Sequence, residues 1–310
     1  MRGLIFGLLA LLLTACSGGA PRDAEFVIPE GASMTRAAQI MEDAGAVADA
    51  DAFVRNARLF GGDEPIKPGE YAVEAGASNS EVLSLIQSGR TRQRFVMIPE
   101  GMPSIMVYER LLANPNLTGS IAVPAEGSIL PDTYAYRRCE PRSAVVARMQ
   151  AAMDAAWAQA WAQRSPRAFP TNRVQAMALA SIIEKETARP SERRTVAAVY
   201  TNRLRLGMRL QADPTIIYPI THGKALGRRI RRSEIDAING YNTYSMAGLP
   251  VGPIANPGRA SIIAALGPAD SDYLYFVADG SGGHVFARTL AEHEANVARW
   301  FAIRRARGEM

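Results

Sequence analysis

The sequence of 310 residues predicts an α+β protein, with small β/α repeats in its N-terminal half and a larger mixed α+β domain after them. Three observations predict this class. A short segment, FVIPEG at residues 26–31, recurs as VMIPEG at residues 96–101. The C-terminal half holds one long apolar run of helical length. Two short β-rich segments flank a glycine-rich turn near the C-terminus.

Residues 1–20 are expected to be a targeting segment. Arg2 precedes an apolar run from Leu4 to Leu13, and small residues then lead to Cys16, as in bacterial lipoprotein signals that leave a lipidated cysteine. The apolar run is shorter than the roughly 20 residues that span a membrane. Counting on through Ala20 gives a marginal span, so an uncleaved membrane anchor is the alternative. With either anchor, the folded part faces an exported compartment.

The repeats divide the N-terminal half into two units, residues 26–94 and 95–165. Each copy of the repeated segment is followed by a helical pattern, and a related β segment comes later, EYAV at residues 70–73 and TYAY at residues 133–136. The order strand, helix, helix, strand, helix is therefore expected in both units. Small β/α repeats of this kind are typically binding or spacing modules.

A largely apolar helix is expected from Val174 to Thr187, inside a domain of residues 166–310. Eight of the ten residues before Glu184 are apolar, so the helix should be buried on most sides. It should carry Glu184 to the edge of an apolar environment. Burial disfavours the charged form of a carboxyl group, which suits a general acid. The alternative is a core helix whose last turn reaches solvent, with Glu184 and Glu186 simply exposed.

The rest of the C-terminal half predicts helices on both sides of a long irregular segment. Ser191 is a good N-cap for a helix that runs to about Leu206, before Gly207. Residues 208–258, rich in Pro, Gly, Asn and Tyr, are expected to form an ordered loop wall without regular elements. A hairpin and a final helix follow, at residues 273–287 and 290–305.

Composition excludes several classes of function. The net charge is +5, and residues 189–232 hold eleven basic residues against two acids. In an exported protein this stretch indicates binding to peptidoglycan carboxylates or to an anionic membrane surface, not to nucleic acid. The simpler alternative is that these basic residues lie on solvated helix faces. The three histidines lack metal-ligand spacing, so neither a metal nor another cofactor is expected. With Cys16 at the anchor, only Cys139 remains, so no disulfide is expected within the mature chain.

Glycoside cleavage is the chemistry that the carboxylates favour. It needs a protonated carboxyl group at the scissile oxygen and a group that stabilises an oxocarbenium ion. Glu184 fits the first role. Glu186 projects about 200° around the helix from Glu184, away from the same cleft. Asp213 lies in the loop segment and is well placed to line a groove, although an Asx-turn before Pro214 is its structural alternative.

Several long blocks in collinear order carry a resemblance to a known family. They are EGSILPDTY at residues 126–134, LASIIEKET at 179–187, YTNRLRLGMRLQADPT at 200–215, YNTY at 241–244, GLPVGPIANPG at 248–258, YLYFVADG at 273–280 and GHVF at 283–286. Together they resemble the endolytic murein transglycosylases of the MltG (YceG-like) type. The resemblance covers approximately residues 26–300, and the combination of blocks makes it specific.

The resemblance implies LysM-like repeats in the N-terminal half and places the family's catalytic glutamate on Glu184. It also implies a lytic mechanism, in which this one carboxyl group protonates the bridging oxygen after N-acetylmuramic acid and then accepts the proton of that sugar's C6 hydroxyl. The products end in 1,6-anhydro-N-acetylmuramic acid, and neither water nor an enzyme nucleophile is required. Gln211, Asp213, Asn242 and Tyr244 are expected to line the glycan groove, with packing roles as the alternative for Asn242 and Tyr244.

The resemblance further implies a location and partners. Nascent peptidoglycan glycan strands are the expected substrate, and peptidoglycan synthases are the expected partners. The periplasmic face of the inner membrane is the expected location, with the outer membrane as the alternative. Relatives commonly carry a spanning helix, whereas this chain has a lipobox-like Cys16. Two other functions fit the residues: a non-catalytic wall-binding protein that docks a synthase, and a glycoside hydrolase that uses Asp213, Glu184 and water.

Overall fold

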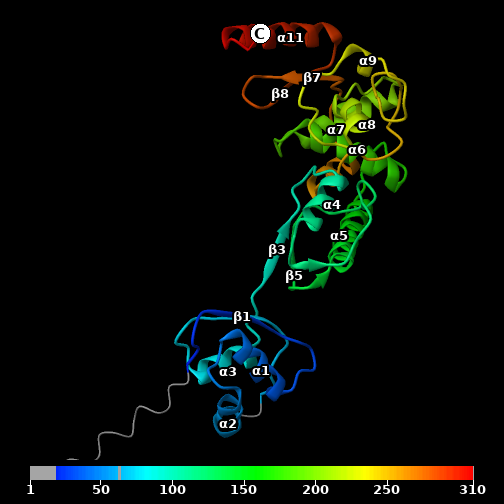
Figure 1. Cartoon of the computed structure of the whole chain (residues 1–310). Helices are drawn as coiled ribbons and strands as arrows, with labels where there is room; N and C mark the ends of the chain where they lie inside the picture. The colour runs from blue at the N-terminus through cyan, green and yellow to red at the C-terminus, as the bar shows by residue number, and fades with distance from the viewer. Residues whose placement is uncertain (1–18, 62–63, 310) are drawn as a thin grey trace, which may run out of the picture. The chain divides into compact units, whose positions relative to one another are not determined.

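The computed structural model describes residues 19–61 and 64–309, so the expected lipid anchor at Cys16 lies outside the described residues. The chain divides into two compact units, one of residues up to 95 with 135–139, the other of residues 96–134 and 140–310. Figure 1 shows the helices and strands of both. Within the described residues, no helix is both long and apolar enough to span a membrane.

The first unit folds helices onto an antiparallel pair of strands. Its elements follow the expected order: β1 (Ala24–Ile28), α1 (Met34–Ala44), α2 (Ala50–Phe60), β2 (Gly69–Val73) and α3 (Asn79–Ser88). Phe26 of β1 lies opposite Tyr71 of β2, and the two buried rings stack in the core. The side chains of Ser33, Asp49 and Ser78 accept hydrogen bonds from the first turns of the three helices, which determines where each helix begins.

The second copy of the repeat has the two expected strands and the first and last expected helices, but not the second helix. β3 (Arg94–Met97) leads through Pro-Glu-Gly into α4 (Ser104–Leu112), as β1 leads into α1. Gly31 and Gly101 both adopt a left-handed conformation, with φ of 75° and 71°, which glycine adopts without a steric penalty. Residues 113–132, all described, hold only the short β4 (Leu117–Thr118) and no helix, so the expected second helix is wrong. Three prolines in these residues disfavour a helix.

The core of the second unit is built on α5 (Arg142–Ala162), α6 (Arg173–Glu186), α7 (Arg193–Arg205) and α10 (Arg259–Leu266). α6 packs against α7 and α10, and residues 176–183 are all buried. The helix is therefore buried along most of its length, and its last turn carries Glu184 and Glu186 to the edge of the core. Because residues of α5 share this core, residues 95–165 and 166–310, expected as separate domains, lie mostly in one compact unit.

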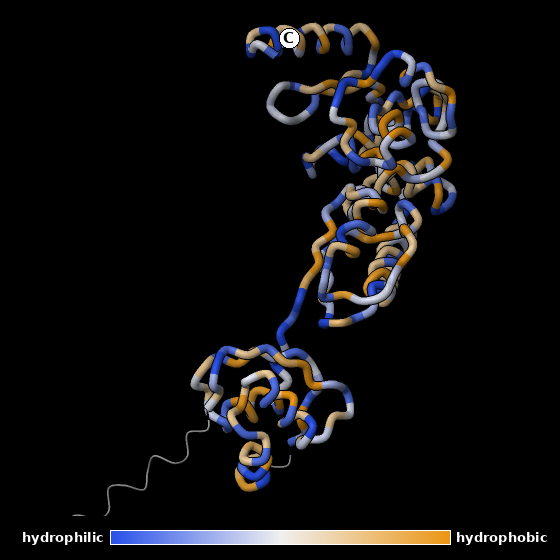
Figure 2. Tube along the Cα trace, viewed as in Figure 1, coloured by the Kyte–Doolittle hydropathy of each residue, from blue (hydrophilic) through white to orange (hydrophobic). Residues whose placement is uncertain are grey.

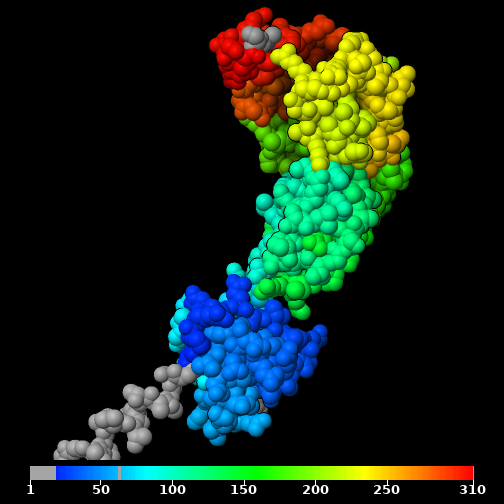
Figure 3. All heavy atoms as spheres, viewed as in Figure 1, coloured from blue at the N-terminus to red at the C-terminus, as the bar shows by residue number. Residues whose placement is uncertain are grey.

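The segment of residues 208–258 is more regular than expected. It contains α8 (Pro214–Thr221) and α9 (Arg232–Ile235), so the expectation of a wall without regular elements is wrong. Pro214 occupies the first turn of α8, where the missing N–H is not needed, and Ile216 packs into the core. On the face of the second unit that Figure 3 shows, this segment (yellow) forms much of the surface.

Near the C-terminus, β7 (Tyr275–Ala278) and β8 (His284–Ala287) pair antiparallel and form the expected hairpin. α11 (Leu290–Ala306) follows and packs against it. Figure 2 shows hydrophobic and hydrophilic residues mixed along α11, and of its residues only Asn296 is buried. With β5 (Thr133–Tyr136) and β6 (Glu140–Pro141), the described residues form an α+β architecture of two-stranded sheets, β1–β2, β3–β5, β4–β6 and β7–β8.

Candidate active site

The last turn of α6 carries Glu184 into a network with α7 and α10. Its side chain is 5% exposed. One carboxylate oxygen accepts a 2.9 Å hydrogen bond from the N–H of Gly258, the N-cap residue of α10. The other oxygen lies 3.5 Å from a guanidinium nitrogen of Arg193. Gly258 and Arg193 therefore hold both carboxylate oxygens of Glu184.

The Pro-Glu-Gly turn of the second repeat completes this network. The same nitrogen of Arg193 lies 3.2 Å from Glu100. A Cβ at Gly258 would overlap the end of the Glu100 side chain, so the two segments lie close together. The carbonyl of Gly101 accepts a 3.4 Å hydrogen bond from Lys185, the neighbour of Glu184. Glu184 therefore joins the end of α6 to two adjacent segments, and protein groups contact both of its oxygens.

Glu186 ends α6 in different surroundings. It is partly buried, and this burial raises its pKa from an ordinary 4.5 to about 7. The Tyr200 hydroxyl and the Arg203 guanidinium, both on α7, oppose the rise, whereas the negative charge of Asp213 adds to it. Glu186 therefore titrates near neutral pH. A group that acts first as an acid and then as a base needs this property.

Two tyrosines border the carboxyl groups of Glu186 and Asp213. Burial raises the pKa of Tyr200 well above its ordinary range, so a neutral phenol faces Glu186. The Tyr244 hydroxyl donates a 2.6 Å hydrogen bond to Asp213. Burial raises the pKa of Tyr244 as well, and the Asp213 carboxylate adds to the rise. The fold thus brings together a carboxyl group of near-neutral pKa and a second carboxylate that a phenol orients.

The other predicted groove residues lie in unlike environments. Gln211 has an exposed side chain and a left-handed φ of 54°, and its N–H donates a 3.2 Å hydrogen bond to the Thr243 carbonyl. Asn242 is fully buried, and its side-chain oxygen, Oδ1, accepts a 2.9 Å hydrogen bond from the Tyr244 N–H. The Asn242 amide donates to the backbone carbonyls of Glu234, Ile235 and Ala237. Asn242 therefore holds the loop that presents Tyr244, which fits the packing alternative.

The residues that hold Glu186, Asp213 and Tyr244 together were not predicted from the sequence. The buried hydroxyls of Thr215 and Thr243 are 2.9 Å apart and join the Asp213 segment to the Tyr244 segment. Arg203 donates hydrogen bonds of 2.9 and 2.6 Å to the carbonyls of Leu210 and Leu274. Glu186 does project away from Glu184, as helical geometry requires, but the polar cluster lies on that side. Tyr200 and Arg203, three residues apart on one helix face, were the available signal.

A profile of the YceG-like family matches residues 26–299 of this chain, a span that covers most of both compact units and includes Glu184 and Glu186. The chain belongs to the YceG-like family.

Named relatives agree with this membership. The YceG-like chain is 27% identical over 301 residues to the endolytic murein transglycosylase of Bacillus subtilis strain 168, across 86% of this chain and 81% of that protein. It is 28% identical over 320 residues to the endolytic murein transglycosylase of Streptococcus pneumoniae strain D39, and spans 57% of that longer protein. The 2.6 Å crystal structure of a YceG-like protein from Listeria monocytogenes matches with a TM-score of 0.56 at 26% identity, covering 88% of this chain and 98% of that one.

The YceG-like chain also has an open hollow of about 720 Å³ at the opposite end of α6. It lies between the start of the helix at Asn172 and the segment of residues 248–251. At about 1.5 Å per residue, the N-cap of α6 is about 20 Å from Glu186. The hollow, which residues 248–251 line, is therefore separate from the cluster of Glu186 and Asp213.

Proposed function

We propose that this YceG-like protein is an endolytic lytic transglycosylase of peptidoglycan. It cleaves the β-1,4 bond between N-acetylmuramic acid and N-acetylglucosamine inside glycan strands, and leaves 1,6-anhydro-N-acetylmuramic acid ends. The names of its relatives support the substrate class, because murein is peptidoglycan. One observation carries the chemistry: burial raises the pKa of Glu186 to about 7 beside Asp213.

In the proposed reaction, protonated Glu186 gives its proton to the bridging oxygen as the bond from that oxygen to C1 breaks. Positive charge then develops on C1 and the ring oxygen. Asp213, close enough to affect Glu186, supplies negative charge that stabilises this cation. The ionised Glu186 next accepts the proton of the C6 hydroxyl, whose oxygen forms the new bond to C1. Glu186 ends the cycle protonated, and no water is consumed.

Glu184, on which the family resemblance places the acid, is the alternative proton donor. The Gly258 N–H and Arg193 hold its two oxygens, so both are engaged in contacts within the protein. Glu186 has the environment that a proton donor needs. We therefore assign the acid/base role to Glu186, and to Glu184 the role of holding the end of α6 against its neighbours.

A water-using glycoside hydrolase is the second candidate, because the cluster contains two carboxyl groups. In such an enzyme Asp213 serves as base or nucleophile, and the glutamate serves as the acid. Tyr244 contacts one Asp213 oxygen, and Asp213 is exposed. The two reactions differ in their products. A hydrolase adds a water oxygen to C1, whereas the lytic reaction adds none.

Digestion of purified sacculi in water labelled with a heavy oxygen isotope tests the proposal. The full-length protein is expected to release anhydro-ended fragments without the heavy isotope, as read by mass spectrometry. Glu186→Gln is expected to release none, while folded Glu184→Gln keeps activity. The reverse result would assign the acid to Glu184. Isotope-labelled reducing ends would establish the hydrolase, and binding to sacculi without release would establish the non-catalytic wall-binding protein.

Attachment and assembly complete the proposal. We propose that lipidated Cys16 anchors the protein in the cell envelope, with its folded units on the periplasmic side of the inner membrane. The lipobox-like sequence before Cys16 supports the anchor. The first unit is proposed to hold glycan as a LysM-like module, supported by its order of strand, helix, helix, strand. Gln211 and Tyr244 are proposed to contact the strand being cut, and peptidoglycan synthases are proposed partners.

A further inference from the structure

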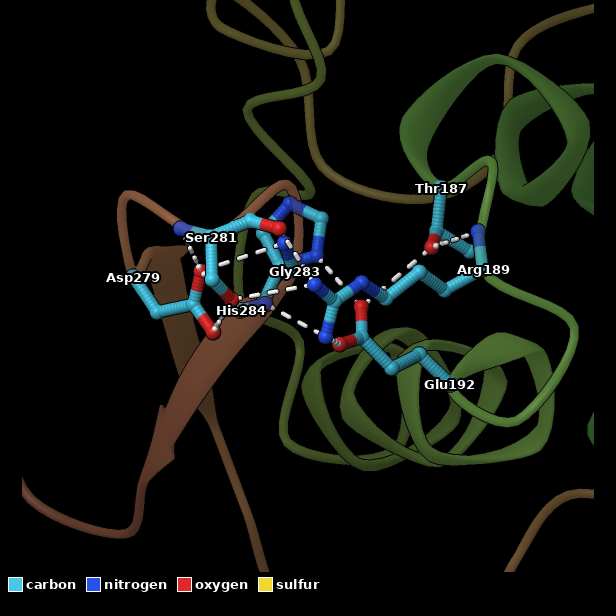
Figure 4. Close-up of polar contacts among 7 residues, drawn as sticks. All are labelled: Thr187, Arg189, Glu192, Asp279, Ser281, Gly283 and His284. Carbon is cyan, nitrogen blue, oxygen red and sulfur yellow. Dashed lines mark hydrogen bonds and ion pairs between the residues drawn. The ribbon is translucent and has the colours of Figure 1, made fainter.

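A carboxylate–histidine pair fastens the α6–α7 connection to the β7–β8 turn, and the reaction above does not use it (Figure 4). Glu192 accepts a 3.1 Å hydrogen bond from the His284 backbone N–H, and its other oxygen lies 2.7 Å from His284 Nδ1. Both side chains are largely buried, at 13% and 17% exposed. Glu192 also occupies the N-cap position of α7, where the sequence favours Ser191.

The protonation of this pair follows from its contacts. Burial raises the pKa of Glu192, but hydrogen bonds from His284 and from the Thr187 hydroxyl outweigh burial and leave the pKa below its ordinary value. Glu192 is therefore ionised at neutral pH and only accepts hydrogen bonds. The facing nitrogen of His284, Nδ1, must then carry the hydrogen.

A second set of contacts keeps the pair closed. The Arg189 guanidinium donates hydrogen bonds to the carbonyl and, at 3.0 Å, to the hydroxyl of Ser281 (Figure 4). Asp279 accepts hydrogen bonds of 2.7 and 3.1 Å from the N–H groups of Ser281 and Gly283, which shapes the turn. A Cβ at Gly283 would overlap Glu192 and Arg189. The backbone of the turn therefore lies directly against the α6–α7 connection.

The pair reaches Glu186 first through the backbone. Thr187, which directly follows Glu186, is buried and ends α6 as its C-cap. Its hydroxyl donates a 3.3 Å hydrogen bond to Glu192 and accepts one of 3.1 Å from the Arg189 N–H. Glu192 therefore restrains the backbone one residue away from the proposed acid.

The second route runs through packed rings. The His284 ring meets Phe276 edge to face, with centroids 5.1 Å apart. Phe276 meets Tyr200 in the same way at 5.8 Å, and the Tyr200 hydroxyl faces Glu186. Because protein interiors are packed without spare volume, a displaced histidine ring shifts its neighbours. The two routes end at the same carboxyl group.

We propose that Glu192 and His284 are positioning residues for the transglycosylase reaction, and that they hold Glu186 in place for proton transfer. They act through Thr187 on one side, and through Phe276 and Tyr200 on the other. The proposal rests on the proposed function, with Glu186 as the acid. Neither residue contacts the glycan in this scheme.

The test compares full-length His284→Ala with the wild type on sacculi. Turnover at saturating sacculi is expected to fall by up to about 100-fold, as for a misplaced catalytic group, with binding to sacculi unchanged. Loss of the pair also admits water to Glu186, so the alkaline limb of the pH–rate profile moves down from about pH 7. Asp213, Arg203, Tyr200 and Tyr244, the titratable neighbours of Glu186, stay in place, so the limb reports on the surroundings of Glu186.

Two variants and a control accompany it. His284→Asn keeps a side-chain N–H near the position of Nδ1, and is expected to restore most of the turnover and the limb. Glu192→Gln removes the negative charge that accepts hydrogen bonds from His284 and Thr187, and it is expected to behave as His284→Ala. Arg288→Ala, which removes an exposed ion pair with Asp272 at the same hairpin, is expected to match the wild type.

Several outcomes overturn the proposal. If His284→Ala has the turnover and the alkaline pH–rate limb of the wild type, the proposal is wrong, but the proposed function stays intact. Lower turnover with an unmoved limb and no recovery in His284→Asn also overturns the proposal, because general destabilisation gives that result. If His284→Ala does not fold, Glu192→Gln decides, and an unmoved limb there overturns the proposal. Wild-type protein that releases no anhydro ends removes the proposed function itself, and this inference with it.

Discussion

The Tyr244 hydroxyl donates a 2.6 Å hydrogen bond to Asp213, and this contact joins residues that lie 31 positions apart in the chain. Asn242 holds the Tyr244 backbone, and the hydroxyl pair of Thr215 and Thr243 ties the two segments together below it. The Asp213 carboxylate is thereby kept where its charge raises the pKa of Glu186. One phenol thus affects both carboxyl groups of the proposed active site.

Tyr244→Phe removes this hydrogen bond and keeps the ring. Turnover of sacculi is expected to fall about tenfold or more, because a hydrogen bond to a charged group contributes about 1.5–3 kcal/mol. The rate of anhydro-end release measures the effect. Tyr273→Phe, whose ring packs under Arg288 at the hairpin, is the matched control and should match the wild type. Equal rates for the two variants would show that Asp213 does not need its phenol partner.

Glu186→Gln is expected to make the folded protein more stable at alkaline pH. Below pH 4.5 the carboxyl group is protonated in both states, so the substitution changes little. Above pH 7 it is ionised in both states, and the folded state is penalised by about 3 kcal/mol, since each pH unit between the two pKa values contributes about 1.4 kcal/mol. Stability of the wild type is therefore lost between these limits as pH rises.

Thermal unfolding of both proteins at pH 4 and pH 9 checks this expectation for Glu186. The Gln variant should unfold at a higher temperature than the wild type only at the alkaline pH. The same difference at both pH values would mean that Glu186 ionises in the fold as easily as in the unfolded chain.

Arg193→Leu is expected to destabilise the second unit by about 3 kcal/mol, because it removes one partner of the buried Glu184 side chain. Adding Glu184→Gln to this variant should recover part of the loss. Urea unfolding of the two single variants and the double variant measures the coupling. Arg232→Ala, which removes an exposed ion pair with Asp236, is the control and should cost little. Additive effects of Arg193→Leu and Glu184→Gln would contradict the buried pair.

Asn242→Ala separates a packing role from glycan contact. It leaves the backbone carbonyls of Glu234, Ile235 and Ala237 without their donor, so a loss of about 2 kcal/mol in the free energy of unfolding is expected. Turnover should fall as well, since Tyr244 loses its support. Urea unfolding and anhydro-end release are the two measurements. Unchanged stability with weaker binding to glycan strands would show that Asn242 contacts the glycan directly.

Elements with a local cause were predictable from the sequence. The apolar run of α6, the β7–β8 hairpin and the first strand–helix–helix–strand unit all appear where the pattern places them. α8 was missed, because Pro and Gly around it indicate a loop, whereas Pro214 at a first helical turn fits a helix equally well. In the second repeat β5 and α5 lie where they were expected, but the second helix is wrong, since FVIPEG and VMIPEG are alike whereas the residues just after α4 are not.

The sequence by itself determined family membership and the placement of two glutamates at the end of a buried helix, because block order and apolar runs are properties of the chain. Only the tertiary structure distinguished Glu184 from Glu186. The two share one local sequence, but Arg193 and Gly258 hold the oxygens of the first, while burial and the charge of Asp213 raise the pKa of the second to about 7. Desolvation and charge act through space, and these partners come from α7, the segment before α8 and the start of α10.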